Sequence, residues 1–256
     1  METAALEAGR MLLDMQPQTR RLASRKDFLT DADLKAEEII LRTLAAEYPD
    51  IPSLSEEKGG EELTIGYQWI VDPVDGTINF FLQDDHWGVS IALAENGRVI
   101  AGTIYLPAKK QLFSALIDIA ARLRRVEEKE TPWENIKVNQ SNLKESQVWL
   151  EWGKEEHEGN DHKKVYEIIE RVDRETLYPQ IRNSAVADMM MVARGNIAGY
   201  VFPKPQPVDI AAAGLIIQQA GGAVTDMEGN AWGPFSRSIV ASNGVTHDEL
   251  LRIIRA

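Results

Sequence analysis

Apolar residues recur at helical spacing in some parts of the chain and form short apolar or β-branched runs in others. The helical spacing predicts helices at residues 2–15, 31–48, 165–172, 184–192, 210–219 and 247–256. The short runs predict strands at residues 67–71, 87–93, 99–106, 111–115, 146–152, 223–226 and 238–242. The tripeptide ENG at residues 95–97 is typical of a hairpin turn, so it predicts that the two strands on either side of it pair with each other.

A charged stretch without clear periodicity, residues 118–139, separates the predicted elements into two groups. We therefore predict an N-terminal α+β domain over residues 1–130 and a C-terminal α/β domain over residues 131–256. Two polar stretches, residues 20–27 and 153–163, are predicted to be loops.

Composition limits the class of partner. The 40 acidic and 28 basic residues give a formal net charge of -12, which argues against nucleic acid and anionic membrane surfaces as partners. No apolar run is long enough to span a bilayer and no signal peptide is apparent, so a cytoplasmic location is the default expectation. The absence of cysteine excludes thiolate catalysis and zinc-thiolate sites, and the four histidines are interpreted as structural or surface residues.

The segment at residues 72–77, with the sequence DPVDGT, holds two carboxylates, a glycine and a hydroxyl. The run at residues 67–71 predicts a buried strand that ends where Pro73 removes a backbone donor. Because a residue before proline is held extended, Asp72 should point out of the carboxyl end of this strand.

The rest of this segment has the chemistry of a ligand site. Gly76 lets the backbone approach a ligand closely, and Thr77 can cap a helix that begins near residue 78. A phosphate there would meet free N–H groups, and the carboxylates suit Mg²⁺. Asp75 followed by Gly76 is also typical of a β-hairpin turn, so the local sequence leaves a metal and phosphate site and a simple hairpin both open.

Other charged residues could join this site. Asp33 lies in the first turn of the helix that Thr30 or Asp31 can cap, where a surface acid that favours the helix dipole is the alternative. Glu56 and Glu57 are paired acids in a loop before the strand at residues 67–71. They could simply be solvated, or a sheet could bring Glu56 beside Asp72.

The segment at residues 203–209 alternates prolines with other residues and leads to a helix that is apolar on nearly every side. It delivers Asp209 to the start of that helix. Lys204 is the basic residue of the segment, and it could reach a substrate oxygen or a second phosphate, or it could be a solvated surface lysine.

Four segments resemble the motifs of one family. Residues 72–80 match the signature D-P-x-D-G-T-x-N-F of the inositol monophosphatase family. Residues 30–33, 55–57 and 208–222 resemble three further elements of that family, in its order and at about its spacings. With all four motifs present, a metal and phosphate site is favoured over the hairpin.

This resemblance implies an α+β fold, a layered α/β sandwich in which helix and sheet layers alternate. It also implies a lithium-sensitive phosphatase that uses two or three Mg²⁺ ions and hydrolyses a small phosphorylated substrate. Because relatives are often dimers, a homodimer is a further expectation.

The resemblance assigns roles to individual residues. The implied ligands of the first metal are Glu56, Asp72 and the carbonyl of Val74. The implied ligands of the second metal are Asp72, Asp75 and Asp209. Asp33 would face a weaker third ion. Glu56 and Thr77 resemble the pair that orients the attacking water, so these two and Asp72 are the implied catalytic residues. The implied substrate contacts are Asp75, Gly76, Thr77, Ser184, Ala185, Lys204 and Asp209.

Phosphate monoester hydrolysis explains these residue types. Charge builds on the attacking, leaving and equatorial oxygens, so the catalyst mostly positions groups and supplies positive charge. No covalent nucleophile is needed, which fits a chain without cysteine.

Four departures from the family pattern bear on the substrate. Val208 replaces the usual tryptophan, and Asn183 replaces a glycine. Phe202 stands where inositol-specific members carry a glutamate, and residues 117–125 replace a glycine-rich segment. The expected substrate is inositol 1-phosphate or a related sugar or polyol phosphate. The alternative substrates are 3'-phosphoadenosine 5'-phosphate and fructose 1,6-bisphosphate. A further alternative, an inactive binding protein, is disfavoured because the implied metal-binding carboxylates are all present: Glu56, Asp72, Asp75 and Asp209.

Overall fold

The structure is a computed structural model that describes residues 1–15, 31–127, 131–151 and 160–256. Thr30, the loop predicted at residues 20–27 and most of the loop predicted at residues 153–163 lie outside the described residues. In the described part of the chain, no helix is long and apolar enough to cross a membrane.

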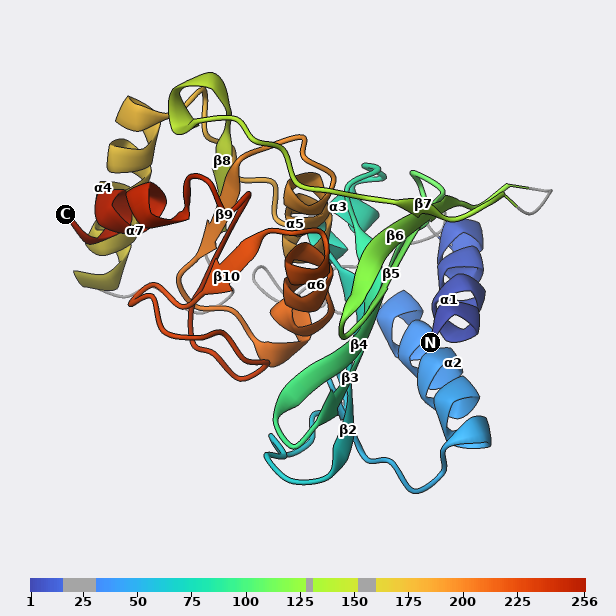
Figure 1. The fold of residues 1–256 in the computed structure, drawn as a ribbon. Coiled ribbons are helices and arrows are strands. Elements are labelled where there is room, and N and C mark those ends of the chain that lie inside the picture. The colour runs from blue at the N-terminus through green and yellow to red at the C-terminus, as the bar shows by residue number, and fades with distance from the viewer. Residues whose placement is uncertain (16–30, 128–130, 152–159) are drawn as a thin grey trace.

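Helix and sheet layers alternate across the molecule, as Figure 1 shows. One outer layer is the helix pair α1 (Glu2–Met15) and α2 (Asp31–Glu47). The central helix layer is α5 (Ala185–Ala193) and α6 (Pro207–Gln219). The other outer layer is α4 (Asn160–Glu175) and α7 (His247–Arg255). A sheet lies between each two neighbouring helix layers, which confirms the predicted α+β layered fold.

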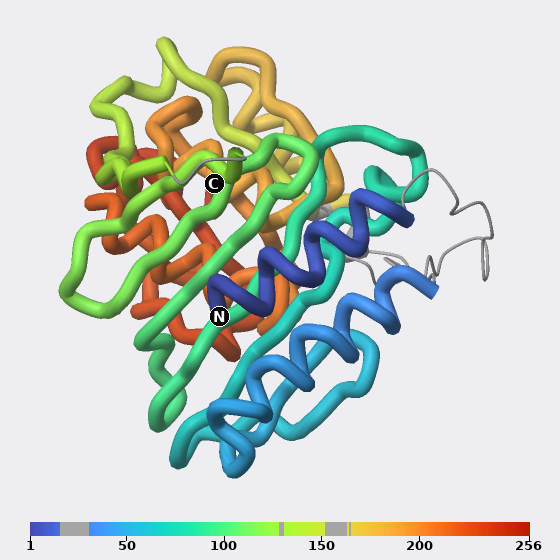
Figure 2. Tube along the Cα trace, turned by 90° about the vertical axis from the view of Figure 1, so that its right-hand side faces the viewer, coloured from blue at the N-terminus to red at the C-terminus, as the bar shows by residue number. Residues whose placement is uncertain are grey.

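The first sheet has seven strands in the order β1-β2-β3-β4-β5-β6-β7. Its strands are β1 (Ser53–Ser55), β2 (Tyr67–Asp75), β3 (Gly88–Glu95), β4 (Arg98–Leu106), β5 (Gln111–Leu116), β6 (Ile119–Arg125) and β7 (Glu134–Asn135). β1 pairs parallel to β2, and every other neighbouring pair is antiparallel. Figure 2 shows α1 and α2 side by side over one face of this sheet. The hairpin predicted at residues 95–97 joins β3 to β4.

The second sheet has four strands in the order β10-β11-β9-β8. Its strands are β8 (Val148–Leu150), β9 (Gly199–Phe202), β10 (Ala223–Thr225) and β11 (Ile239–Ser242). β8 runs parallel to β9, whereas β11 is antiparallel to both of its neighbours. A 3-10 helix, Leu143–Glu145, precedes β8.

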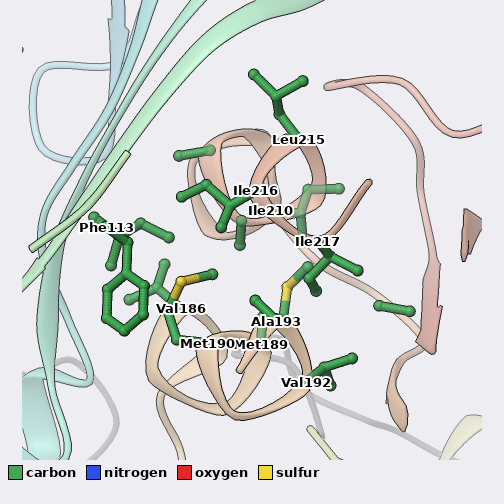
Figure 3. Packing of buried hydrophobic residues seen from close by; sticks show 14 of the residues in the cluster. Phe113, Val186, Met189, Met190, Val192, Ala193, Ile210, Leu215, Ile216 and Ile217 are labelled. Atoms are coloured by element: carbon green, nitrogen blue, oxygen red, sulfur yellow. The ribbon is translucent and has the colours of Figure 1, made fainter. Parts of the chain in front are cut away.

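The central helices α5 and α6 bury apolar side chains on both sides, because a sheet covers each face of their layer. Figure 3 shows Phe113 of β5 beside Val186 and Met190 of α5, with Ile216 of α6 above them. Met189 and Met190 of α5 are buried and fill the core of this cluster. The same apolar cluster joins residues of both sheets.

Several predicted boundaries differ from the structure. The strand predicted at residues 67–71 continues to Asp75, because a bulge between Asp72 and Asp75 accommodates Pro73. The stretch 118–139, predicted to be irregular, contains β6 and β7. These strands lie on both sides of the predicted domain boundary at residue 130, and that division stays a prediction.

Candidate active site

The strand β2 leads directly into a short helix, α3 (Thr77–Phe81). Between them Gly76 has a φ of 82°, in the left-handed region that glycine adopts without strain. The chain thus enters a helix after Asp75-Gly76, which rules out the hairpin alternative. Thr77 is the first residue of α3 and not its cap as predicted, because Gly76 takes the cap position.

The segment is held together by short-range hydrogen bonds. The carboxylate Oδ1 of Asp72 accepts a bond from the Val74 amide at 3.0 Å. The Thr77 hydroxyl donates to the Val74 carbonyl at 3.0 Å and lies 3.4 Å from Oδ1 of Asp33. These contacts bring Asp33, in the first turn of α2, next to the segment that follows β2, as the sequence predicts.

Three carboxylates converge behind this segment. One oxygen each from Asp72, Asp75 and Asp209 lies within 4.8 Å of the others, and all three side chains are buried. Like charges this close and this far from water repel each other strongly unless a cation lies among them. Because carboxylate oxygens are the hard ligands that Mg²⁺ prefers, the donor set fits a Mg²⁺ site.

The first turns of two helices, α5 and α6, fix the positions of Asp75 and Asp209. Asp75 accepts hydrogen bonds from the Ser184 hydroxyl, the Ala185 amide at 3.2 Å and the Val186 amide at 3.1 Å, all at the start of α5. Asp209 lies in the first turn of α6 and accepts a 2.7 Å bond from the Gln206 amide. The predicted substrate residues Ser184 and Ala185 therefore contact a predicted metal ligand.

The short strand β1 places Glu56 at the same edge of the sheet. Its amide donates to the Val71 carbonyl at 3.2 Å, so Glu56 lies alongside the end of β2, as predicted. Neither Glu56 nor Asp33 belongs to the group of three carboxylates defined above. Their roles as metal ligands stay predictions.

Glu37 of α2 is a buried acid that the sequence analysis missed. Its Oε1 accepts hydrogen bonds from the amides of Glu57 at 3.3 Å and Lys58 at 3.1 Å. It therefore fixes the backbone directly after Glu56. Its position four residues after Asp33, on the same face of α2, is a signal that could have identified it.

Two departures from the family pattern have a structural explanation. Asn183, in the place of a glycine, has a φ of 56°, and asparagine is among the residues that tolerate this left-handed conformation. Phe202 is buried in the apolar cluster around α5 and α6 and packs against Tyr200. Lys204, two residues later, is exposed.

The sequence analysis interpreted His86 as a structural or surface residue and did not consider Asp188. The Nε2 atom of His86 lies 2.6 Å from Oδ1 of Asp188, and both side chains are buried. Burial lowers the pKa of His86 to about 4 and raises the pKa of Asp188 well above its usual value. An acidic residue inside the apolar sequence of α5 is the signal that could have pointed to this pair.

Comparisons with known proteins agree with this geometry. The model of the inositol monophosphatase family matches residues 2–256. A fructose-1,6-bisphosphatase/inositol-1-monophosphatase of Thermotoga maritima is 30% identical over 232 residues, covering 90% of this chain and 83% of that protein. An inositol-1-monophosphatase of Mesorhizobium japonicum is 33% identical over 266 residues, covering 100% and 94%. The solved structure of a Thermotoga maritima IMPase superposes with a TM-score of 0.86 at 27% identity, covering 99% of this chain and 94% of that one.

Proposed function

Because the chain belongs to the inositol monophosphatase family and resembles phosphatases of that family, we propose that it hydrolyses a small phosphate monoester by Mg²⁺-assisted attack of water on phosphorus. The observation that carries this proposal is the group of three buried carboxylates, Asp72, Asp75 and Asp209, beside the turn at Gly76. Burying three carboxylates together is costly unless cations compensate their charge, so this group suits a site that holds cations.

We assign two Mg²⁺ ions to this group, with a third, weaker ion beside Asp33. The Val74 carbonyl and Glu56 would complete the first site. When bound, the ions would supply the positive charge that offsets charge on the attacking and leaving oxygens, and would lower the pKa of the attacking water.

The residues of the chain would position the reactants. The backbone amides of Gly76 and Thr77 would donate to phosphate oxygens. Thr77 and Glu56 would orient the attacking water, and the contact between Thr77 and Asp33 supports a fixed hydroxyl at that point. Ser184 and Ala185 would act by holding Asp75 in place.

The substrate we propose is inositol 1-phosphate or a related sugar or polyol phosphate. Phe202 stands where inositol-specific relatives carry a glutamate, and its burial leaves no acceptor there for a ring hydroxyl. A broader substrate range is therefore expected. Fructose 1,6-bisphosphate is the second candidate, because the similar Thermotoga maritima protein is a fructose-1,6-bisphosphatase/inositol-1-monophosphatase.

A phosphate-release assay tests this proposal. The purified chain is assayed with Mg²⁺ against inositol 1-phosphate, fructose 1,6-bisphosphate and adenosine 3',5'-bisphosphate. Turnover of the first or second supports the proposal, and turnover of the third alone identifies the nucleotide alternative. Mg²⁺ binding without turnover of any of them would favour a binding protein.

Lys204 is exposed five residues before Asp209, so we propose that it contacts a substrate oxygen or a second phosphate. Lys204→Ala should then raise the KM for at least one active substrate. Lys144→Ala, at another exposed lysine in the 3-10 helix, is the matched control. An unchanged KM for every active substrate would remove Lys204 from the site.

A further inference from the structure

His86 and Asp188 form a buried pair that the proposed reaction does not use directly. His86 lies between α3 and β3, and Asp188 lies in the first turn of α5, 102 residues later. Their side chains, 2% and 0% exposed, meet at 2.6 Å. The pair therefore connects the loop after α3 with the helix that holds Asp75.

On one side the pair contacts the segment of the proposed phosphate site. The His86 carbonyl accepts a 2.7 Å bond from the side-chain amide of Asn79 in α3. The same amide nitrogen donates to the carbonyl of Arg182 at 2.7 Å, and Arg182 lies two residues before Ser184, the cap of α5. A methyl group added at Gly76 would lie 3.1 Å from the His86 carbonyl, so His86 packs closely against the turn at Gly76.

On the other side the pair leads to a proposed metal ligand. The Asp188 amide donates to the Ser184 carbonyl at 3.0 Å, within the first turn of α5. The Ser184 hydroxyl donates to Asp75. These contacts link Gly76 to His86, His86 to Asp188, Asp188 to Ser184 and Ser184 to Asp75. Because Asp75 directly precedes Gly76, the series of contacts ends where it began.

We propose that His86 and Asp188 are positioning residues whose hydrogen bond sets the spacing between the Gly76 turn and the start of α5, and so holds Asp75 in the orientation that binds Mg²⁺. This inference rests on the proposed phosphatase function. Partners of metal ligands orient those ligands, and their loss typically weakens metal binding by about 10- to 100-fold. The pair does not contact Asp75 directly but acts through Ser184. Loss of the pair should therefore weaken Mg²⁺ binding less, by about three- to tenfold.

The hydrogen bond itself, and not the charge of Asp188, is what the spacing requires. Asp188→Asn can still offer an oxygen or an N–H to Nε2 of His86, whichever atom holds the proton. Asp188→Ala and His86→Ala cannot. The asparagine variant should therefore keep its Mg²⁺ affinity within about twofold of the unaltered chain, whereas both alanine variants should bind Mg²⁺ about three- to tenfold more weakly.

A second buried histidine supplies the control. His247 at the start of α7 bonds to the Ser242 hydroxyl at 2.8 Å and the Thr225 hydroxyl at 2.9 Å, in an outer layer of the fold. His247→Ala removes comparable contacts, so it should lower the melting temperature without changing Mg²⁺ affinity.

The experiment measures Mg²⁺ binding by calorimetry and by the rise of melting temperature with Mg²⁺, together with KM and kcat. The proposal predicts weaker Mg²⁺ binding in His86→Ala and Asp188→Ala, rescue in Asp188→Asn, and no change in His247→Ala. If the alanine variants lose stability but bind Mg²⁺ normally, the pair is only a core contact and the proposal is wrong.

Should the alanine variants not fold, the double variant His86→Phe with Asp188→Leu replaces both partners by apolar groups, which can be nearly neutral for stability. Weaker Mg²⁺ binding by this double variant then supports the proposal, and normal Mg²⁺ binding contradicts it. Mg²⁺ binding by the unaltered chain without turnover of any phosphate ester would refute the proposed function. The comparison of Mg²⁺ affinities would still decide the role of the pair.

Discussion

Gly76→Ala tests whether the turn after β2 depends on a residue without a side chain. The φ of 82° places Gly76 in the left-handed region, which costs an alanine about 1–2 kcal/mol. The added methyl group would also lie 2.9 Å from Cβ of Ser184 and 3.1 Å from the His86 carbonyl. Contacts this short force a shift of the neighbours, and inserting a methyl group into a packed core costs about 1–3 kcal/mol.

The expected loss of unfolding free energy is therefore about 2–5 kcal/mol, measured by urea denaturation. Gly221→Ala is the control, because Gly221 has a φ of 86° and no described atom within 4 Å of an added methyl group. It should lose only the conformational part, about 1–2 kcal/mol. The difference between the two variants isolates the contact with Ser184 and His86.

Activity gives the second measurement. Because the Ser184 hydroxyl holds Asp75, a displacement of Ser184 should lower kcat/KM of Gly76→Ala by at least about tenfold. Gly221→Ala, at the end of α6, should keep normal kinetics. Equal destabilisation of the two variants, with full activity in Gly76→Ala, would refute the reasoning that this turn needs glycine because of close packing at the site.

Three further outcomes are expected. Asp72→Asn should abolish turnover while the chain without metal keeps or raises its melting temperature, since one of three repelling charges is removed; substantial residual activity would contradict the metal assignment. Glu37→Ala should lower the unfolding free energy by about 1–3 kcal/mol and raise the Mg²⁺ concentration needed for activity, because two backbone N–H groups beside Glu56 lose their acceptor; unchanged Mg²⁺ dependence would limit Glu37 to a stabilising role. Removing metal with EDTA should lower the melting temperature. Adding Mg²⁺ at about 100 times its Kd should raise the free energy of unfolding by about 2.7 kcal/mol, whereas Na⁺ at equal ionic strength should not raise it.

The sequence predicts most of the local backbone structure around residues 72–77, because that structure depends on neighbouring residues. The order of residues from Asp72 to Thr77 restricts the backbone through a proline and a glycine, and the structure shows the strand, turn and helix that follow from it. Asp33 and Asp209 each lie in the first turn of a helix whose apolar spacing is clear in the sequence. Two predicted details of this segment are wrong: the strand continues to Asp75 and does not end before Pro73, and Gly76, not Thr77, takes the cap position.

Other parts depend on contacts between distant residues and leave little trace in the sequence. The strand β6 is rich in arginine, a composition that does not predict a strand. In the structure, the guanidinium groups of Arg122 and Arg124 lie over Trp133 at 4.2 and 4.9 Å, and Arg122 also pairs with Glu2 at 3.0 Å. These partners become visible only once the strands are placed.

The same distinction explains why the substrate is harder to predict than the reaction. Asn183 keeps the left-handed turn that a glycine would adopt, so that change preserves the start of α5 and its contacts with Asp75. Phe202, at the position where inositol-specific relatives carry a glutamate, is part of the apolar core. Two basic residues lie near these positions in the sequence: Lys204 is exposed two residues after Phe202, and Arg182 directly precedes Asn183 and lies 4.0 Å from Asp84 and over the ring of Trp149.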